Sequence, residues 1–131
     1  MDAKGQGKTV SLAIDNWFIT DDNSYLYQQP ASMLIEALED SIILQLSHKD
    51  EQKLRAHTYK FETFRRHQLE IALAYIQRRR IAGLTLTAEE RYRQFAKNYP
   101  LFLQRVPQFA IASYLGMTSQ YLSKIKNKIL S

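Results

Sequence analysis

Polar and basic side chains recur on one face of the segment Thr118–Lys128, near the C-terminal end of the sequence. Helical spacing places Leu122 and Ile125 on one side of this segment, so Gln120 and Lys124 fall on the opposite, exposed side. Amide and ammonium groups on an exposed helix hydrogen-bond to base edges and phosphates in a DNA groove. The chemistry that this pattern predicts is therefore DNA recognition. The predicted contact residues are Thr118, Ser119, Gln120, Ser123, Lys124, Lys126 and Lys128.

The elements that must position this face are predicted to be a helix, a sharp turn and a second helix. Pro107 suits a first helical position, because the N–H that proline lacks has no partner there. Gly116 readily adopts the left-handed conformation that ends a helix, and Thr118 is a good N-cap for the next helix. The predicted apolar face consists of Ile111, Ala112, Leu115, Leu122 and Ile125. This combination is typical of a DNA-reading helix-turn-helix, with an ordinary helical hairpin as the alternative.

The charge of the chain is unevenly distributed. The net charge is +5, and residues 1–88 hold equal numbers of basic and acidic side chains. Residues 89–131 hold seven Lys and Arg against only Glu89 and Glu90, so they carry the whole excess. A phosphate backbone is the partner that such an end favours, and a solvated basic tail is the alternative.

Several other kinds of protein are excluded or not supported. The chain has no cysteine, which excludes disulfides, thiolate catalysis and cysteine-ligated zinc or iron–sulfur centres. No apolar run is long enough to cross a membrane, and the N-terminus lacks the apolar core of a signal peptide. His48, His57 and His67 do not have the spacing of metal ligands. We therefore expect a cytoplasmic protein that is not an enzyme and needs no cofactor.

The first part of the chain has the alternating pattern of β-strands. Strands are predicted over Thr9–Ile14, Met33–Leu38 and Ile42–Leu46. Asp15 and Asn16 are predicted to turn the chain, and a short helix is expected around Tyr25–Tyr27. This half of the chain is thus expected to be an antiparallel meander.

The pattern becomes helical at Ser47, which can cap a short helix that ends near Ala56. A long helix is predicted from about Tyr59 to about Ala82, followed by a bend at Gly83. Thr87 and Glu90 form a capping box for a helix over Ala88–Asn98. Pro100 should end that helix, and Leu101–Val106 is predicted to be a short apolar link to the helix-turn-helix.

The long helix is apolar nearly all round in its middle, so more than one side must be covered. We expect the helix around Phe61–Ile81 to form a homodimer, because DNA-reading helices usually act in pairs on two half-sites, ~34 Å apart. A single central core helix is the alternative. Arg78, Arg79 and Arg80 suit the C-terminal end of the helix, where they oppose its macrodipole.

The order of these elements resembles the Crp/Fnr family of bacterial transcription regulators. The resemblance lies in IEALEDSIILQLS (Ile35–Ser47), in the long helix, and in AEERYRQFAKNYPLFLQRVPQFAIASYLGMTSQYLSKIKNKI (Ala88–Ile129). The last stretch is similar to the wingless branch of the family. The resemblance implies an α+β fold: a cyclic-nucleotide-binding-like β-roll, here partial and antiparallel, a long dimerisation helix, and an all-α helix-turn-helix domain. It also implies RNA polymerase as a further partner.

On this resemblance the domains are residues 1–57, a partial β-roll sensor-like domain, residues 58–86, the dimerisation helix and hinge, and residues 87–131, the DNA-binding domain. The family's base-contacting positions fall on Ser119, Gln120 and Lys124. The first half of the β-roll has no counterpart in this sequence. We favour a chain that begins at an internal methionine of a longer protein over a true loss of that half.

The cyclic-nucleotide pocket of the family has no match in this sequence. Ala31 occupies the position of the family's phosphate-binding arginine, and Ser32 that of the small residue beside it. Without the arginine there is no bidentate clamp for a cyclic phosphate. Asp21 falls near the acidic position that would meet a ribose hydroxyl, although a solvated loop acid is the favoured interpretation. We therefore expect no bound cyclic nucleotide.

The sequence as a whole predicts a sequence-specific DNA-binding transcription regulator that acts as a homodimer on a palindromic operator. The alternative is a ligand-sensing or protein-interaction module, a truncated regulator that heterodimerises through the long helix.

Overall fold

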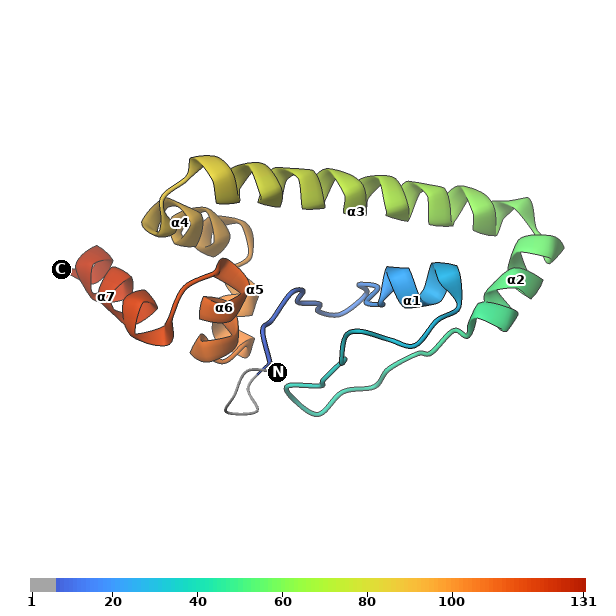
Figure 1. The fold of residues 1–131 in the computed structure, drawn as a ribbon, viewed down its shortest axis with the longest axis horizontal. Helices are drawn as coiled ribbons and strands as arrows, with labels where there is room; N and C mark the ends of the chain where they lie inside the picture. Colours follow the sequence, from blue (N-terminus) through green and yellow to red (C-terminus); the bar gives the residue numbers. More distant parts are fainter. Residues whose placement is uncertain (1–6) are drawn as a thin grey trace. The chain divides into compact units, whose positions relative to one another are not determined.

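A computed structural model describes residues 7–131. Within this range the chain consists of helices and extended connections, and it contains no β-strand (Figure 1). The predicted α+β class with a partial antiparallel β-roll is therefore wrong. The chain divides into two compact units: unit 1 is the segment up to Ile19 together with Thr85–Ser131, and unit 2 is Thr20–Leu84.

None of the three predicted strands, Thr9–Ile14, Met33–Leu38 and Ile42–Leu46, is a β-strand in the structure. An alternating pattern states which side chains would share a face of a sheet, but each strand also needs a neighbour for its N–H and C=O groups. In residues 7–131 these segments form no β-ladder with one another or with a further segment. The two later segments leave their apolar side chains exposed, whereas the first packs on helices of unit 1.

The described part of unit 1 contains the helices α4 (Ala88–Asn98), α5 (Pro100–Arg105), α6 (Gln108–Leu115) and α7 (Ser119–Leu130). The predicted capping box is confirmed, because the Thr87 side chain accepts the Glu90 N–H and the Glu90 side chain accepts the Thr87 N–H. Helix α5 corrects the prediction of a short link over Leu101–Val106. Pro100 ends α4, and it also occupies the first turn of the next helix, where proline is well tolerated.

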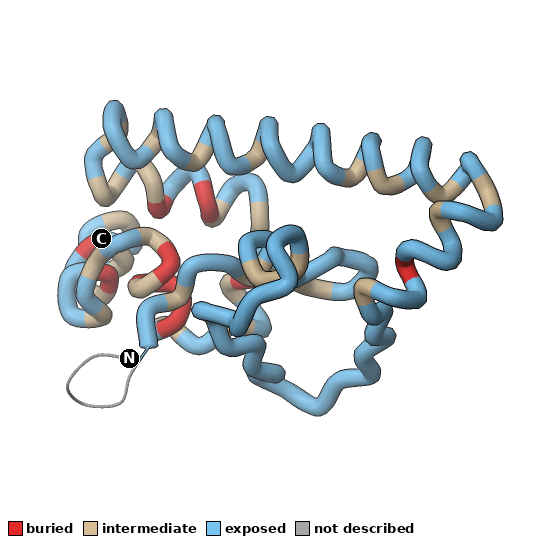
Figure 2. The backbone as a smooth tube through the Cα atoms, turned by 45° about the vertical axis from the view of Figure 1, so that its right-hand side comes forward, coloured by how far each residue is buried: buried red, intermediate tan, exposed pale blue. Residues whose placement is uncertain are grey.

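All the buried apolar side chains of the described chain belong to unit 1 (Figure 2). They are Tyr92, Phe95, Phe102, Ala110, Ile111, Ala112, Tyr114, Leu122 and Ile125. Phe95 stands at the centre of this core, with its ring 5.9 Å from Phe102 and 5.7 Å from Tyr114. Since burial of a large apolar side chain contributes about 1.5–3 kcal/mol, this core is what stabilises the packing of α4 to α7.

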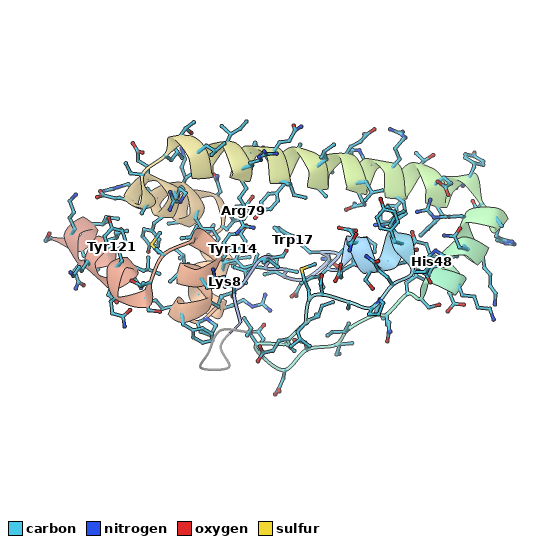
Figure 3. The ribbon with its side chains drawn as sticks, in the orientation of Figure 1. Lys8, Trp17, His48, Arg79, Tyr114 and Tyr121 are labelled. Carbon is cyan, nitrogen blue, oxygen red and sulfur yellow. The ribbon has the colours of Figure 1, made fainter. Side chains whose placement is uncertain are left out.

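The segment 7–19 completes unit 1 although it lies far from the helices in sequence. The Thr9 N–H donates to Ser113 Oγ of α6 at 2.8 Å. The predicted turn is confirmed at Asn16, which has a positive φ of 68°, and it brings Trp17 back over the helices. The Trp17 ring, labelled in Figure 3, belongs to this segment. It lies edge-on to Phe102, with ring centroids 5.6 Å apart. The segment predicted as a strand is therefore an arm that packs against α5 and α6.

Unit 2 contains α1 (Asp22–Tyr27), α2 (His48–His57) and α3 (Tyr59–Thr85, of which the last residue belongs to unit 1). The predictions of all three helices are confirmed, including the cap of α2, where Ser47 Oγ accepts the Asp50 N–H. The bend predicted at Gly83 is wrong, because α3 continues through this residue. A single glycine weakens a helix by about 1 kcal/mol but does not end it.

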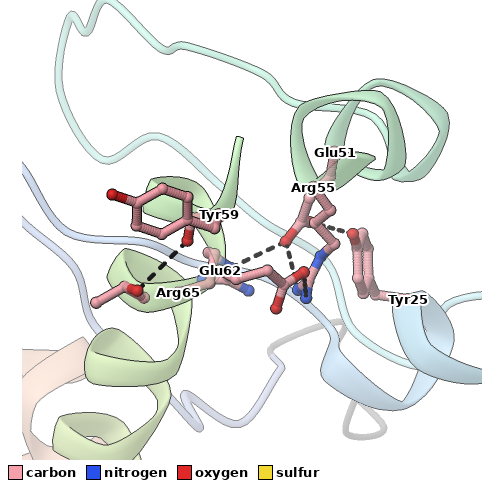
Figure 4. A network of polar contacts seen from close by, with 7 residues as sticks. Tyr25, Glu51, Arg55, Tyr59, Glu62 and Arg65 are labelled. Atoms are coloured by element: carbon pink, nitrogen blue, oxygen red, sulfur yellow. Dashed lines mark hydrogen bonds and ion pairs between the residues drawn. The ribbon is translucent and has the colours of Figure 1, made fainter. Parts of the chain in front are cut away.

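The helices of unit 2 meet at a charged cluster and not at an apolar core. Glu51 of α2 is only 3% exposed, and its carboxylate accepts hydrogen bonds from Tyr25 of α1, from Arg55, and from Arg65 of α3 (Figure 4). Arg55 also pairs with Glu62 at 2.7 Å. Burial raises the pKa of Glu51, but the hydrogen bonds from Tyr25 and Arg55 and the charge of Arg65 more than reverse this effect, so its pKa is lowered.

None of the helices in the described range is long and apolar enough to span a membrane.

Candidate nucleic-acid interface

The turn between α6 and α7 forms as the sequence predicts. Gly116 has φ 75° and ψ 35°, and its N–H donates to the Ser113 carbonyl at 3.1 Å. The Met117 N–H donates to the Ala112 carbonyl at 2.9 Å, which completes the hydrogen-bonded end of α6. Thr118 then caps α7, because its hydroxyl accepts the Tyr121 N–H at 3.1 Å. The Thr118 side chain, a predicted DNA contact, is thus engaged in holding the start of the second helix.

One detail at the start of α6 differs from the prediction. Pro107 is the N-cap, with an extended ψ of 145°, and Gln108 is the first helical residue. The Pro107 carbonyl still accepts the N–H groups of Ala110 and Ile111, at 3.0 and 3.2 Å. Helix α6 therefore starts one residue later than expected, and Pro107 is its N-cap and not its first helical residue.

The predicted apolar face of the two helices is confirmed in its main residues. Ile111, Ala112, Leu122 and Ile125 are all buried, and Leu122 is only 1% exposed. Leu115, which completes the predicted face, is half-buried. The small Ala112 side chain is only 1% exposed, so a larger side chain there would have to displace its neighbours.

The opposite face of α7 is exposed. Gln120 and Lys124 lie on it one helical turn apart, and neither side chain makes a hydrogen bond or ion pair with another described residue. Tyr121, labelled on α7 in Figure 3, is 49% exposed beside them. Sequence reasoning did not single out Tyr121, although its spacing of three residues from Lys124 could have revealed it. These three side chains are available to bind a ligand.

One flank of this face is fixed by Gln108 of α6. Its amide nitrogen donates to Ser123 Oγ at 2.7 Å and to the Ser119 carbonyl at 3.3 Å, and its amide oxygen accepts from Lys126 at 3.3 Å. Ser119, Ser123 and Lys126, all predicted DNA contacts, are therefore partly engaged inside the protein. Gln108 could have been identified from the sequence by one feature: it is a polar residue directly after Pro107, at the predicted start of the helix.

The other flank is fixed by Glu89 of α4. Its carboxylate accepts from Lys128 at 2.8 Å and from Arg93 at 3.0 Å. The hydrogen bond from Lys128 and that from Arg93 lower the pKa of Glu89. Lys128, the last of the predicted contact residues, is thus paired with an acid, and a phosphate would have to compete with that acid.

Two further cations of the basic end have structural partners. Arg91 donates to the carbonyl oxygens of Leu86 and Leu115, at 3.0 and 3.3 Å, and so ties the start of α4 to the end of α6. Arg105 pairs with Asp15 of the arm at 3.3 Å. The seven Lys and Arg of residues 89–131 therefore divide into two groups. Some hold unit 1 together, and others remain available to bind phosphates, of which Lys124 and Lys97 are exposed.

In unit 2, Asp21, which the resemblance to the Crp/Fnr family would place near a cyclic-nucleotide pocket, has a structural role. The Asp21 carboxylate caps α1 by accepting the Ser24 N–H, and it also accepts the N–H groups of Ser32 and Met33. These hydrogen bonds, with that from Ser24 the largest effect, lower the pKa of Asp21. The hollow that Asp21 and Ala31 line contains no Lys or Arg side chain. No His, Asp or Glu cluster in residues 7–131 could hold a metal ion.

Comparisons of the chain with protein-family models, with curated proteins and with solved structures found no match. Function is therefore inferred from the residues and geometry described above.

Proposed function

We propose that this chain is a sequence-specific DNA-binding transcription regulator that acts as a homodimer on a palindromic operator. The observation that carries the proposal is the outer face of α7. Gln120 and Lys124 project from the second helix of a tightly capped helix-turn-helix, and they have no partner among the described residues. A glutamine amide fits the N6 and N7 edge of adenine, and a lysine fits guanine or a phosphate.

The charge distribution supports the same proposal. In residues 7–19 and 85–131, unit 1 holds eight Lys and Arg against three Asp and Glu. Unit 2 holds nine of each and is neutral. The entire net charge thus belongs to the unit that contains α6 and α7. A positive DNA-reading unit gains affinity for any duplex through counterion release, and its base contacts then select the sequence.

The homodimer is proposed on the exposed apolar surface of α3. Leu69, Leu73 and Ile76 lie at helical spacing, and each is about half exposed. An apolar stripe of this length is covered in most proteins, and a second α3 is the simplest cover for a regulator that reads two half-sites. The resemblance to the Crp/Fnr family supports the proposal through the helical part of the chain alone, since the expected β-roll is absent from residues 7–131.

The same apolar surface favours one alternative function. A protein-interaction module could use α3 to pair with a different protein instead of a second copy. The size of the purified protein in solution distinguishes the two, because the alternative predicts a monomer that dimerises only with its partner.

The test of the proposal is a pull-down of sheared genomic DNA with the full chain, with the retained fragments sequenced at low and at near-physiological salt. A shared two-fold-symmetric motif that survives the higher salt is the expected result. Retention that ignores sequence and disappears with salt would reduce the function to general attraction between a basic unit and phosphate.

A further inference from the structure

Asn127 of α7 lies on the same line of the helix as Gln120 and Lys124. The three residues are spaced at i, i+4 and i+7, which places them one above the other on one face of an α-helix. All three are exposed, and none of their side chains makes a hydrogen bond or ion pair with another described residue. We call these three residues the reading line. Asn127 is not among the contact residues predicted from the sequence.

The side chains on both flanks of the reading line are held inside unit 1. On one flank, Gln108 accepts a hydrogen bond from Lys126 at 3.3 Å and donates one to Ser123 at 2.7 Å. On the other flank, the Glu89 carboxylate accepts from Lys128 at 2.8 Å. The restrained side chains thus border the line, and the unrestrained ones form its centre. A duplex that docks on α7 can contact the reading line without first breaking a protein contact.

Helix stability does not explain an asparagine at this position. Asparagine is among the poorer helix formers, because its side chain competes for backbone groups in non-helical conformations. Asn127 does not have the positive φ for which asparagine is often selected. The helix ends at Ser131, whose N–H donates to the Asn127 carbonyl, so the Asn127 amide side chain is not used as a cap. The amide therefore has no structural use within the described chain.

We propose that Asn127 is a specificity-determining residue that reads an adenine in the major groove, as a second base contact beside that of Gln120. The inference rests on the proposed function, because it requires α7 to lie in the groove. The amide nitrogen of Asn127 would donate to adenine N7, and its amide oxygen would accept from N6. No other base presents an acceptor and a donor side by side on its major-groove edge, so this contact selects adenine.

The spacing of the residues along α7 sets the spacing of the bases. An α-helix rises ~1.5 Å per residue, so Asn127 lies ~10.5 Å along the helix axis from Gln120. Base pairs in B-DNA are stacked ~3.4 Å apart, so a helix that follows the groove covers about two to three base pairs over this distance. The half-site therefore contains two adenines, on either strand, about two to three base pairs apart. Lys124 contacts a guanine or a phosphate between them.

The experiment selects bound sequences from a random duplex library with the full chain at near-physiological salt. It compares the wild-type protein with Asn127→Ala, Gln120→Ala and Asn98→Ala. Asn98 is the matched control, since it is an exposed asparagine in α4 of the same unit. We expect the wild-type protein and Asn98→Ala to select both adenines, Asn127→Ala to lose one of them, and Gln120→Ala to lose the other.

A competition assay then measures the same contact in single duplexes. The affinity of Asn127→Ala for the selected half-site should fall by about tenfold, and replacing the lost adenine in the DNA should have no further effect on this variant. Alanine is a better helix former than asparagine, so Asn127→Ala should unfold at the same temperature as the wild-type protein or at a higher one. Its lost sequence preference would then not come from an unfolded α7.

The outcomes separate this inference from the proposed function. A wild-type selection without a shared motif would overturn the proposed function and this inference with it. A wild-type motif that Asn127→Ala leaves unchanged would overturn this inference alone. Equal weakening of all sequences by Asn127→Ala, with the motif retained, would make Asn127 a contact to the DNA backbone and would also overturn its role in sequence choice.

Discussion

Lys128 of α7 and Glu89 of α4 form an ion pair of 2.8 Å, and the same carboxylate also holds Arg93 of its own helix. One acid thus restrains two cations at the edge of the proposed DNA-reading face. Both cations are more than half exposed, so the pairs contribute little to stability. Their main effect is on how many charges the face can offer to phosphates.

The first prediction concerns this acid. Glu89→Gln should increase affinity for every DNA sequence alike, because it removes a negative charge and releases two cations. The slope of log K against log salt should become steeper by about one to two. The measurement is a salt titration of binding to unrelated duplexes. Glu90→Gln is the matched control, with the same change of charge one residue away and no cationic partner. If the two variants behave alike, the pairing of Lys128 and Arg93 has no influence on binding.

The second prediction concerns sequence choice. Gln120→Ala and Lys124→Ala should each lower affinity for the selected operator by about 1–3 kcal/mol and relax the preference at one base pair. The measurement is competitive binding to the operator and to its single-base variants. Lys97→Ala removes an exposed cation of α4 and should leave the ranking of these sites unchanged. Retained affinity and ranking in the α7 variants would show that a different face reads the DNA.

The third prediction concerns Lys126 and Lys128, which the sequence analysis predicted alike as DNA contacts but which should differ in their effect on affinity. Lys126→Ala should weaken binding to all DNA and lower the salt slope by about 1, as expected for a phosphate contact. Lys128→Ala should have a smaller effect, because Glu89 already neutralises this lysine in the free protein. Salt titrations of the two variants side by side provide the measurement. A larger effect of Lys128→Ala would mean that DNA breaks the ion pair at no cost.

The fourth prediction compares two glycines. Neither Gly116 nor Gly83 has any atom within 4 Å of the position of an added Cβ, so space does not distinguish them. Gly116 has φ 75°, which a residue with a Cβ adopts at a cost, and Gly116→Ala should destabilise unit 1 by about 1 kcal/mol. Gly83 lies within α3, so Gly83→Ala should stabilise that helix by roughly 0.5–1 kcal/mol. Denaturant unfolding followed by circular dichroism should give opposite signs.

The fifth prediction concerns the Glu51 cluster and pH. Since folding lowers the pKa of Glu51, its contribution to stability is complete above its ordinary pKa of about 4.5 and is lost as the pH falls through the lowered value. Glu51→Gln should remove this dependence and lower the stability of unit 2 by roughly 3 kcal/mol, because Arg55 and Arg65 lose their shared partner.

The two units can be followed separately in this test. Trp17 is the only tryptophan and lies in unit 1, so its fluorescence reports on that unit, whereas α3 dominates the helical signal of unit 2. Glu51→Gln should therefore shift the circular dichroism transition more than the fluorescence transition. Glu70→Gln, which removes an exposed pair with Arg66, serves as the control and should have little effect. Equal shifts in both signals would mean that the cluster stabilises the chain as a whole.

The features that the sequence predicted correctly depend on local interactions. The Thr87 capping box, the Gly116 turn and the Thr118 cap each involve residues within a few positions of one another, so the types and spacing of residues suffice. The buried positions Ile111, Leu122 and Ile125 follow from helical spacing alone.

The features that were missed depend on distant residues. Whether Ile42–Leu46 becomes a strand depends on a neighbour, which the alternating pattern does not specify. The contact of Gln108 with Ser123 and Lys126, and that of Lys128 with Glu89, arise only when three helices pack together. Helix α5 was missed for a different reason, since Pro100 both ends one helix and begins the next.

The arm that carries Trp17 has a consequence for the order in which the protein can fold during synthesis. The arm is synthesised before α5 and α6, against which it packs, and the whole of unit 2 lies between them in the sequence. Closing this long loop costs conformational entropy, so unit 1 is completed by a late, non-local step. Until then Trp17 and its neighbours lack the apolar partners that cover them in the folded unit, and such transiently exposed surface favours aggregation.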